Sequence, residues 1–310
     1  MSTLRDLWTL TKPGVTRMCA LTSAGAAWLA LSGPNSPFDA ETPADGWCSP
    51  GFAVAFAGVI GASLAVAGAS AFNMWLERRR DPLMARTRNR PLATGRLPDR
   101  VGLIFSVSLM ALAIAVLALF TNTLTALLAA WAAVGYTLVY TPLKYRTPLA
   151  LVIGAVPGAA PPLLGWTAVT GSLDAGGLAL FGILLVWQMP HFLAITLFRQ
   201  ADFARAGIQC VPVVRGVLVT RLQAVAWSML LVPISLAPTV IGLTGMLYGT
   251  VALVLGLGFF GLACTGLGLP DESSRPSGPG LDIRWARRFF FASLLYLPLL
   301  IAALVVDVML

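Results

Sequence analysis

Residues 101–120 read VGLIFSVSLMALAIAVLALF and contain no charged residue. A helix rises about 1.5 Å per residue, so about 20 apolar residues cross the hydrocarbon core of a bilayer. This stretch therefore predicts a transmembrane helix. Working outward, comparable apolar stretches lie at residues 15–33, 52–76, 123–141, 149–170, 177–198, 223–243, 246–268 and 289–307. The sequence predicts nine spans.

The composition agrees with a membrane protein. Hydrophobic residues make up 57% of the 310 and charged residues only 11%, whereas soluble domains carry about 25% charged residues. We therefore expect an all-α, polytopic membrane bundle of nine transmembrane helices. It should form a single integral-membrane domain over residues 1–310, with a flexible inner loop at about 270–284 that is rich in Pro, Gly and Ser.

The distribution of charge predicts the topology. With the N-terminus inside, all 21 Lys and Arg fall in inner segments, as the positive-inside rule requires. The outer segments carry acids instead, namely Asp39, Glu41, Asp45, Asp174 and Asp307. No cleavable signal peptide precedes the first span, which favours a multi-pass protein of the bacterial inner membrane with a cytoplasmic N-terminus. The basic residues belong to several juxtamembrane loops, so nucleic acid is not expected as a partner.

The four cysteines are Cys19, Cys48, Cys210 and Cys264. None has the C-x-x-C spacing of a metal site, and they predict no disulfide framework. We interpret them as small apolar side chains.

Polar side chains gather where the second span ends. Asn73, Glu77 and Asp81 are spaced i, i+4 and i+8, which on a helix places them on one face. Pro82 disfavours helix at the residue before it, so the helix should end at about Asp81. Oxygen ligands that converge at a membrane boundary suit a hard cation such as Mg²⁺. The alternative is that these acids pair with nearby arginines.

A dense run of guanidinium groups follows these acids. It reads Arg86-Thr-Arg88-Asn89-Arg90-Pro-Leu, and guanidinium groups bind phosphate bidentately. The alternative is a topology anchor. Because one short segment supplies both carboxylates for Mg²⁺ and arginines for phosphate, we favour a diphosphate site at the cytoplasmic face.

The loop after the sixth span supplies another acid, Asp202, between Arg199 and Arg205. Four spans separate this loop from the one after the second span, which hints at two four-helix halves facing each other, with a ninth helix added. Asp202 would then face Asn73, Glu77 and Asp81. The alternative for Asp202 is an ordinary surface ion pair.

The ordered motifs resemble those of the UbiA superfamily of intramembrane prenyltransferases, and within it the branch that farnesylates heme b. The first is N-x-x-x-E-x-x-x-D followed by RTRNRPL. The others are TKPGVT at 11–16, YTPLKYRT at 140–147, IG at 153–154, GAAPPLLGW at 158–166, WQMPHF at 187–192 and DFARAG at 202–207. The sequence departs from the family pattern at Arg79, usually an acid, at Ala150, usually Asn, and at Phe203, usually Tyr.

The resemblance implies helices around a central cavity that binds farnesyl diphosphate. Mg²⁺ would be the cofactor, held by Asn73, Glu77, Asp81 and Asp202, with Lys144, Arg90 and Arg199 on the phosphates. The farnesyl group would pass to a vinyl group of heme b with addition of water, giving heme O for terminal heme-copper oxidases. The resemblance also implies that membrane lipid surrounds the helices and that a heme A synthase or an oxidase assembly protein is the protein partner.

His191 is the only histidine in the chain. On sequence alone it reads as a core side chain. With heme as the implied substrate, it becomes a candidate iron ligand or propionate contact. Two other classes stay open: a UbiA-type enzyme with another aromatic or tetrapyrrole acceptor, and a non-catalytic heme carrier or transporter.

Overall fold

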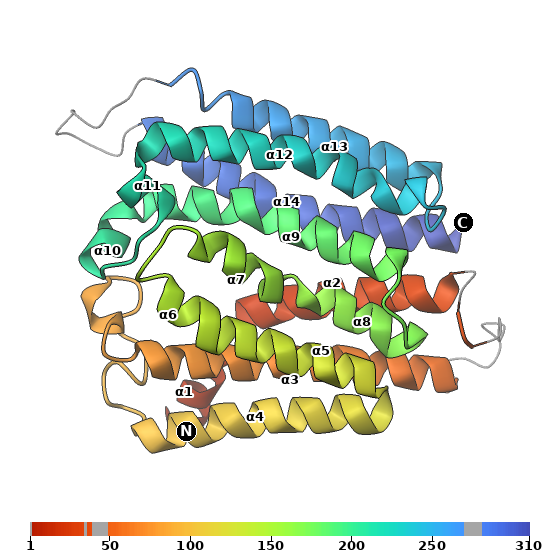
Figure 1. The fold of residues 1–310 in the computed structure, drawn as a ribbon, viewed down its shortest axis with the longest axis horizontal. Helices are drawn as coiled ribbons and strands as arrows, with labels where there is room; N and C mark the ends of the chain where they lie inside the picture. The colour runs from red at the N-terminus through yellow and green to blue at the C-terminus, as the bar shows by residue number, and fades with distance from the viewer. Residues whose placement is uncertain (1, 34–35, 39–48, 270–280) are drawn as a thin grey trace. The chain divides into compact units, whose positions relative to one another are not determined.

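The computed structural model describes residues 2–33, 36–38, 49–269 and 281–310, which form helices and turns with no strand in these ranges (Figure 1). The expected all-α class is confirmed. The outer acids Asp39, Glu41 and Asp45, the cysteine Cys48, and residues 270–280 of the expected inner loop lie outside the described residues.

Eight helical segments in the described ranges are long and apolar enough to cross a membrane. They are Pro50–Glu77, Asp99–Phe120, Thr123–Leu143, Ala150–Thr170, Ala175–Phe198, Gly216–Val240, Met246–Cys264 and Asp282–Met309. They match eight of the nine expected spans. A 20-residue helix, α2 (Pro13–Ser32), stands at the ninth, but Arg17 and several Ser and Thr make it less apolar. The protein is a multi-pass membrane protein.

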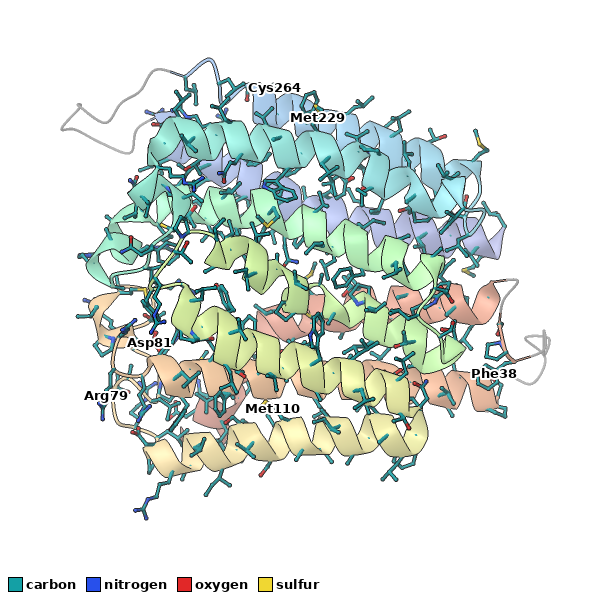
Figure 2. All side chains as sticks on the ribbon, in the orientation of Figure 1. Phe38, Arg79, Asp81, Met110, Met229 and Cys264 are labelled. Atoms are coloured by element: carbon teal, nitrogen blue, oxygen red, sulfur yellow. The ribbon has the colours of Figure 1, made fainter. Side chains whose placement is uncertain are left out.

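The surfaces of these helices suit lipid. Leu119 is 77% exposed and Val240 is 81% exposed, and Met229 also points outward from its helix (Figure 2). Large apolar side chains are exposed along most spans, which a soluble protein would avoid.

The chain divides into two compact units, which are described separately. The first unit comprises Met1–Pro142 and Val156–Phe181, and the second comprises Leu143–Ala155 and Gly182–Leu310. The boundaries cut through helices α6 (Thr141–Leu143), α7 (Ala150–Gly158) and α9 (Ala175–Phe198).

In the first unit, α3 (Pro50–Glu77) is the central helix. It packs against α2, α4 (Asp99–Phe120) and α8 (Ala160–Thr170) (Figure 1). Small residues allow the close approach that is common between membrane helices. At Gly165 of α8, a Cβ atom would lie 2.1 Å from the backbone oxygen of Ser23 in α2, so only glycine fits there.

The segment Thr123–Leu143 is not a uniform α-helix. It consists of α5 (Thr123–Val134), the π-helix η3 (Gly135–Tyr140) and the short α6 (Thr141–Leu143). The Thr141 hydroxyl donates a 2.9 Å hydrogen bond to the Tyr136 carbonyl, five residues back. π-Helical turns within α-helices often accompany functional sites. This one directly precedes Thr141, whose hydroxyl bonds to Asn73 of α3.

The second unit contains the remaining helices. After α7 to Ala155 and α9 from Gly182, these are α10 (Gln200–Arg205), α11 (Val211–Val214), α12 (Gly216–Val240), α13 (Met246–Cys264) and α14 (Leu281–Met309). Helix α13 packs against α12 and α14. The inner loop was expected to reach residue 284, but α14 already begins at Leu281. Asp282 explains the earlier start of the helix. As an acid in the first turn it interacts favourably with the helix dipole, and it also pairs with the buried Arg221 of α12.

Candidate functional site

The end of α3 carries the three predicted oxygen ligands in buried positions. Asn73 is 2% exposed, Glu77 5% and Asp81 0%. The prediction that the helix runs to about Asp81 is wrong, because α3 ends at Glu77 and Asp81 begins the 3-10 turn η2 (Asp81–Leu83). Pro82 has no N–H for a helical hydrogen bond, and the Arg80 N–H already turns back to the Glu77 carbonyl at 2.7 Å.

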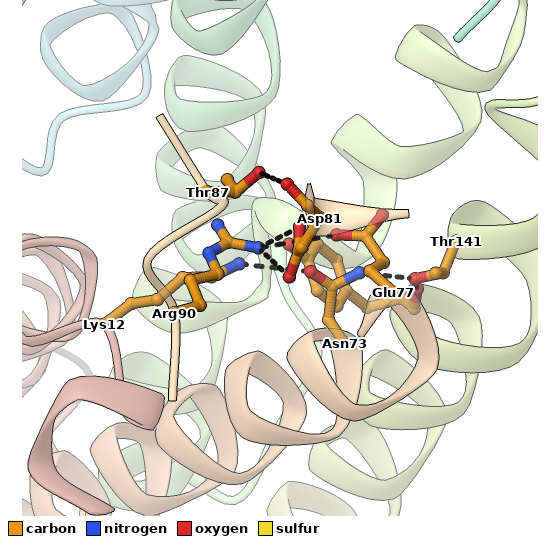
Figure 3. Close-up of polar contacts among 8 residues, drawn as sticks. Lys12, Asn73, Glu77, Asp81, Thr87, Arg90 and Thr141 are labelled. Carbon is orange, nitrogen blue, oxygen red and sulfur yellow. Dashed lines mark hydrogen bonds and ion pairs between the residues drawn. The ribbon is translucent and has the colours of Figure 1, made fainter. Parts of the chain in front are cut away.

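Asp81 nevertheless lies close to Glu77, because Arg90 contacts both. Arg90 Nη1 donates to both carboxylate oxygens of Asp81, at 2.9 and 3.0 Å, and lies 3.9 Å from Glu77 Oε2 (Figure 3). The Thr87 hydroxyl donates to the Asp81 backbone carbonyl at 2.8 Å, which holds the loop in a compact turn. One guanidinium thus links the two acids of the motif.

A lysine completes the cluster from another element. Lys12 Nζ donates to Asn73 Oδ1 at 3.2 Å, and Asn73 Nδ2 donates to Thr141 Oγ1 at 3.0 Å (Figure 3). The Lys12 backbone has φ 48°, in the left-handed region that non-glycine residues rarely adopt. Such strain costs about 1–3 kcal/mol and is frequent at functional sites.

The electrostatics of the cluster reflect burial among charges. Burial, together with the neighbouring Arg90 and Arg86, lowers the pKa of Lys12 from 10.5 to about 7, against an opposing effect of Asp81. Burial raises the pKa of Asp81, although Arg90, Thr87 and Lys12 each oppose that shift. Arg90 therefore supplies the positive charge that the buried carboxylates need, and Lys12 adds to it while it is protonated.

The donor set fits a hard divalent cation. Asn73, Glu77 and Asp81 offer amide and carboxylate oxygens, the ligands that Mg²⁺ takes in proteins. Lys12 and Arg90 contact these same oxygens in this structure. A metal ion at this cluster would replace them as the counter-charge, leaving an ammonium and a guanidinium beside it for an anionic ligand.

The remaining residues of the arginine run lie farther out. Arg86, Arg88 and Asn89 are exposed, whereas Arg90 contacts the buried acids and Arg86 acts on Lys12 through its charge. Arg79, where the family usually has an acid, is also exposed, whereas Asp81 is buried (Figure 2). This departure therefore leaves the buried acids in place.

Two of the predicted residues in the second unit, Lys144 and Arg199, lie in turns, and two, His191 and Asp202, lie in helices. Asp202 in α10 pairs with Arg205 and lies 3.7 Å from Arg199 Nη1, so the simple ion pair anticipated for it is present. The Lys144 carbonyl accepts from Gln209 N at 2.9 Å, and Lys144 Nζ lies 5.4 Å from the centre of the Tyr145 ring. The approach of Asp202 to Asn73, Glu77 and Asp81 would join two units and stays a prediction.

His191 lies in α9, held by an aromatic and polar environment. Its ring stacks on Trp187 with centroids 4.8 Å apart, and Nδ1 lies 2.8 Å from Ser293 Oγ of α14. This residue is partly exposed, so it is not simply a core side chain.

Sequence reasoning assigned no role to Lys12 or Thr141. Both lie in stretches that carried the family resemblance, TKPGVT and YTPLKYRT. A lysine directly before Pro-Gly at the start of an apolar helix was the available signal. Its contact with Asn73 spans 61 positions of sequence, which no local pattern predicts.

Comparison with known proteins decides the family. The profile of the UbiA prenyltransferase family matches residues 19–294. The chain belongs to this family. The family match includes α3 with Asn73, Glu77 and the following Asp81, α9 with His191 and the first half of α14, so the resemblance in the sequence is confirmed.

Similar UbiA proteins share one name. The chain is 44% identical over 290 residues to a protoheme IX farnesyltransferase of Sorangium cellulosum, covering 94% of this chain and 100% of the relative. A relative of the same name from Myxococcus xanthus is 43% identical over 302 residues, covering 97% and 94%. One from Aquifex aeolicus is 33% identical, covering 98% and 95%.

Solved UbiA structures share the fold. A digeranylgeranylglyceryl phosphate synthase superposes with a TM-score of 0.74 at 17% identity, over 99% of both chains. A UbiA homologue from Archaeoglobus fulgidus, bound to GPP and Mg²⁺, gives a TM-score of 0.61 at 16% identity, over 96% of this chain and 99% of that one. At such identities the likeness concerns the fold.

Proposed function

We propose that this protein transfers a farnesyl group from farnesyl diphosphate to a vinyl group of heme b, with addition of water, and so makes heme O. The observation that carries the proposal is the name protoheme IX farnesyltransferase on relatives 43–44% identical over nearly the whole chain. The buried cluster of carboxylates and cations agrees with it, because a diphosphate leaving group needs both kinds of residue.

In this proposal the diphosphate of the substrate binds at the end of α3. Asn73, Glu77 and Asp81, with Asp202 of the second unit, hold Mg²⁺ in this proposal, and a UbiA homologue bound to GPP and Mg²⁺ supports the choice of metal. When bound, Mg²⁺ neutralises charge on the departing pyrophosphate. Arg90 and Lys12 bind its oxygens, as do Lys144 and Arg199, with Arg86, Arg88 and Asn89 at the entrance.

The chemistry then requires charge stabilisation and exclusion of water. The bond between C1 of the farnesyl group and the diphosphate oxygen breaks, leaving pyrophosphate and an allylic cation. The vinyl group of heme b donates its electron pair to C1, water adds to the other vinyl carbon, and one proton is released. Apolar surroundings of the reacting groups would keep water from the cation until the new carbon–carbon bond has formed.

The whole chain acts as one prenyltransferase domain in this proposal. The family profile runs through both compact units, which supports a single domain over the chain. The absence of Lys and Arg from the outer segments supports a cytoplasmic N-terminus and a cytoplasmic active site in the bacterial inner membrane. A heme A synthase or an oxidase assembly protein would receive the product.

The test is mass spectrometry of heme extracted after purified protein is incubated with heme b and farnesyl diphosphate, with and without Mg²⁺. We expect a Mg²⁺-dependent heme that is heavier by one farnesyl group and one hydroxyl group. Asp81→Asn should abolish it, whereas Arg79→Ala, a matched change at an exposed position of the same segment, should not.

Unchanged heme with folded wild-type protein would contradict the proposal. Farnesylation of a quinone-type aromatic or another tetrapyrrole in the same assay would then identify a different UbiA acceptor. Stoichiometric heme binding without any consumption of farnesyl diphosphate would identify a heme carrier.

A further inference from the structure

The hydroxyl of Ser293 determines which nitrogen of His191 carries the proton. Ser293 is fully buried in α14, and its Oγ donates to the Phe290 carbonyl at 2.6 Å. A serine hydroxyl has one proton to donate, and a carbonyl can only accept. Ser293 Oγ must therefore accept its second hydrogen bond, the 2.8 Å contact with His191 Nδ1. Nδ1 is the donor in that contact and carries a proton.

The second nitrogen, Nε2, is then the one that carries a lone pair. A doubly protonated imidazolium within an apolar span would be costly, and α9 is apolar around His191. In the neutral ring, a proton on Nδ1 leaves Nε2 as an acceptor. Nε2 makes no hydrogen bond within the described part of the chain, and His191 is partly exposed.

The ring is also held in a fixed orientation. Trp187, one helical turn before His191, stacks on it and donates its own N–H to the Ser293 carbonyl at 2.9 Å. Phe290 packs against the ring with centroids 4.8 Å apart. Ser293 therefore contacts two successive turns of α9, through its backbone carbonyl and through its hydroxyl. A histidine that donates through one nitrogen to a fixed acceptor is the arrangement found at histidines that ligate metals.

We infer that Ser293 is a positioning residue that holds His191 as the Nδ1–H tautomer, so that Nε2 coordinates the iron of the heme substrate. The heme part of this inference rests on the proposed function. A propionate is an anion that needs a hydrogen-bond donor, and Nε2 in this tautomer has none to offer. The geometry thus selects iron ligation over a propionate contact.

The tautomer can be measured on the protein without heme. Because His191 is the only histidine, its signals need no assignment. Full-length protein labelled with [¹⁵N]histidine gives the spectrum of one imidazole. We expect a protonated Nδ1 and an unprotonated Nε2 in the wild type, with a shift toward the Nε2–H tautomer in Ser293→Ala. Ser228→Ala is the matched control, since Ser228 is a buried helical serine bonded only to the Ala224 carbonyl in the described contacts. It should leave the spectrum unchanged. An Nε2–H tautomer in the wild type overturns the inference.

Iron ligation is read from the resonance Raman spectrum of ferrous heme b bound to the full-length protein. We expect an iron–histidine stretching band that disappears in His191→Ala. In Ser293→Ala the band should fall in frequency and heme affinity should fall about 10- to 100-fold, as when other partners of metal ligands are removed. Ser293→Thr, which keeps a hydroxyl, should restore both.

The outcomes separate this inference from the proposed function. Farnesylated heme with a band that persists in His191→Ala overturns the ligand assignment and leaves the function intact. Wild-type protein that shows the Nδ1–H tautomer but neither binds nor modifies heme refutes both the function and the iron ligation. Only the role of Ser293 in setting the tautomer then survives.

Discussion

Arg90 Nη1 lies 2.9 Å from Oδ1 of Asp81 and 3.0 Å from Oδ2, with Asp81 fully buried. Removing one partner of a buried ion pair leaves an uncompensated charge and costs about 3–5 kcal/mol. Arg90→Ala should therefore lower the thermal unfolding temperature. Added Mg²⁺ should raise that temperature more in Arg90→Ala than in the wild type, because the metal can replace the lost counter-charge. Equal Mg²⁺ effects in the two proteins would argue against a metal site here, and Arg79→Ala serves as the control.

Lys12 predicts a dependence of stability on pH. Its pKa is about 7 in the folded protein and 10.5 ordinarily. Between these values the unfolded chain binds more protons at this residue, so its contribution to stability rises with pH. We expect wild type to gain stability relative to Lys12→Met as the pH rises from about 7 to about 10. Parallel pH curves for the two proteins, measured by thermal unfolding in detergent, would show that Lys12 is not buried as described.

Thr141 fixes the amide of Asn73, because Nδ2 of Asn73 donates to Thr141 Oγ1 and leaves Oδ1 facing Lys12. Thr141→Val removes the acceptor with little change of shape. The Mg²⁺ concentration for half-maximal farnesyl transfer should rise about 10- to 100-fold, as when a side chain that holds a metal ligand by a hydrogen bond is lost. Thr137→Val is the matched control, since among the described residues the Thr137 hydroxyl bonds only to the Ala133 carbonyl, one turn before it in the same span. The same rise in both variants would point to a general disturbance of η3.

Gly165 tests the packing of α8 on α2. An added methyl group would meet the Ser23 backbone oxygen at 2.1 Å, and overpacking of this kind costs about 1–3 kcal/mol. Gly165→Ala should lower the unfolding temperature. Gly258→Ala, at a helical position with nothing within 4 Å, should leave it unchanged or raise it. An unaffected Gly165→Ala protein would show that these helices are less closely packed.

The sequence was most informative about spans and composition and least informative about long-range contacts. The apolar stretch 101–120 corresponds closely to α4, because lipid requires one uniform pattern. The acids of α3 could be recognised from their spacing, yet Asp81 lies in a turn outside the helix. The contacts Lys12–Asn73 and His191–Ser293 join residues 61 and 102 positions apart, and they depend on tertiary packing that no local signal contains.

The charges of Lys12, Arg90, Glu77 and Asp81, gathered in one cluster, also have a consequence for the order in which Mg²⁺ and the substrate bind. With Lys12 protonated and both acids ionised, the charges of these four side chains sum to zero. A Mg²⁺ ion entering by itself would therefore add two uncompensated positive charges to a poorly solvated place, whereas Mg²⁺ carried by a diphosphate adds almost none. Electroneutrality thus favours binding of the metal as a complex with its diphosphate substrate. Isothermal titration calorimetry should therefore detect weak binding of Mg²⁺ alone and much tighter binding of Mg²⁺ when pyrophosphate is present.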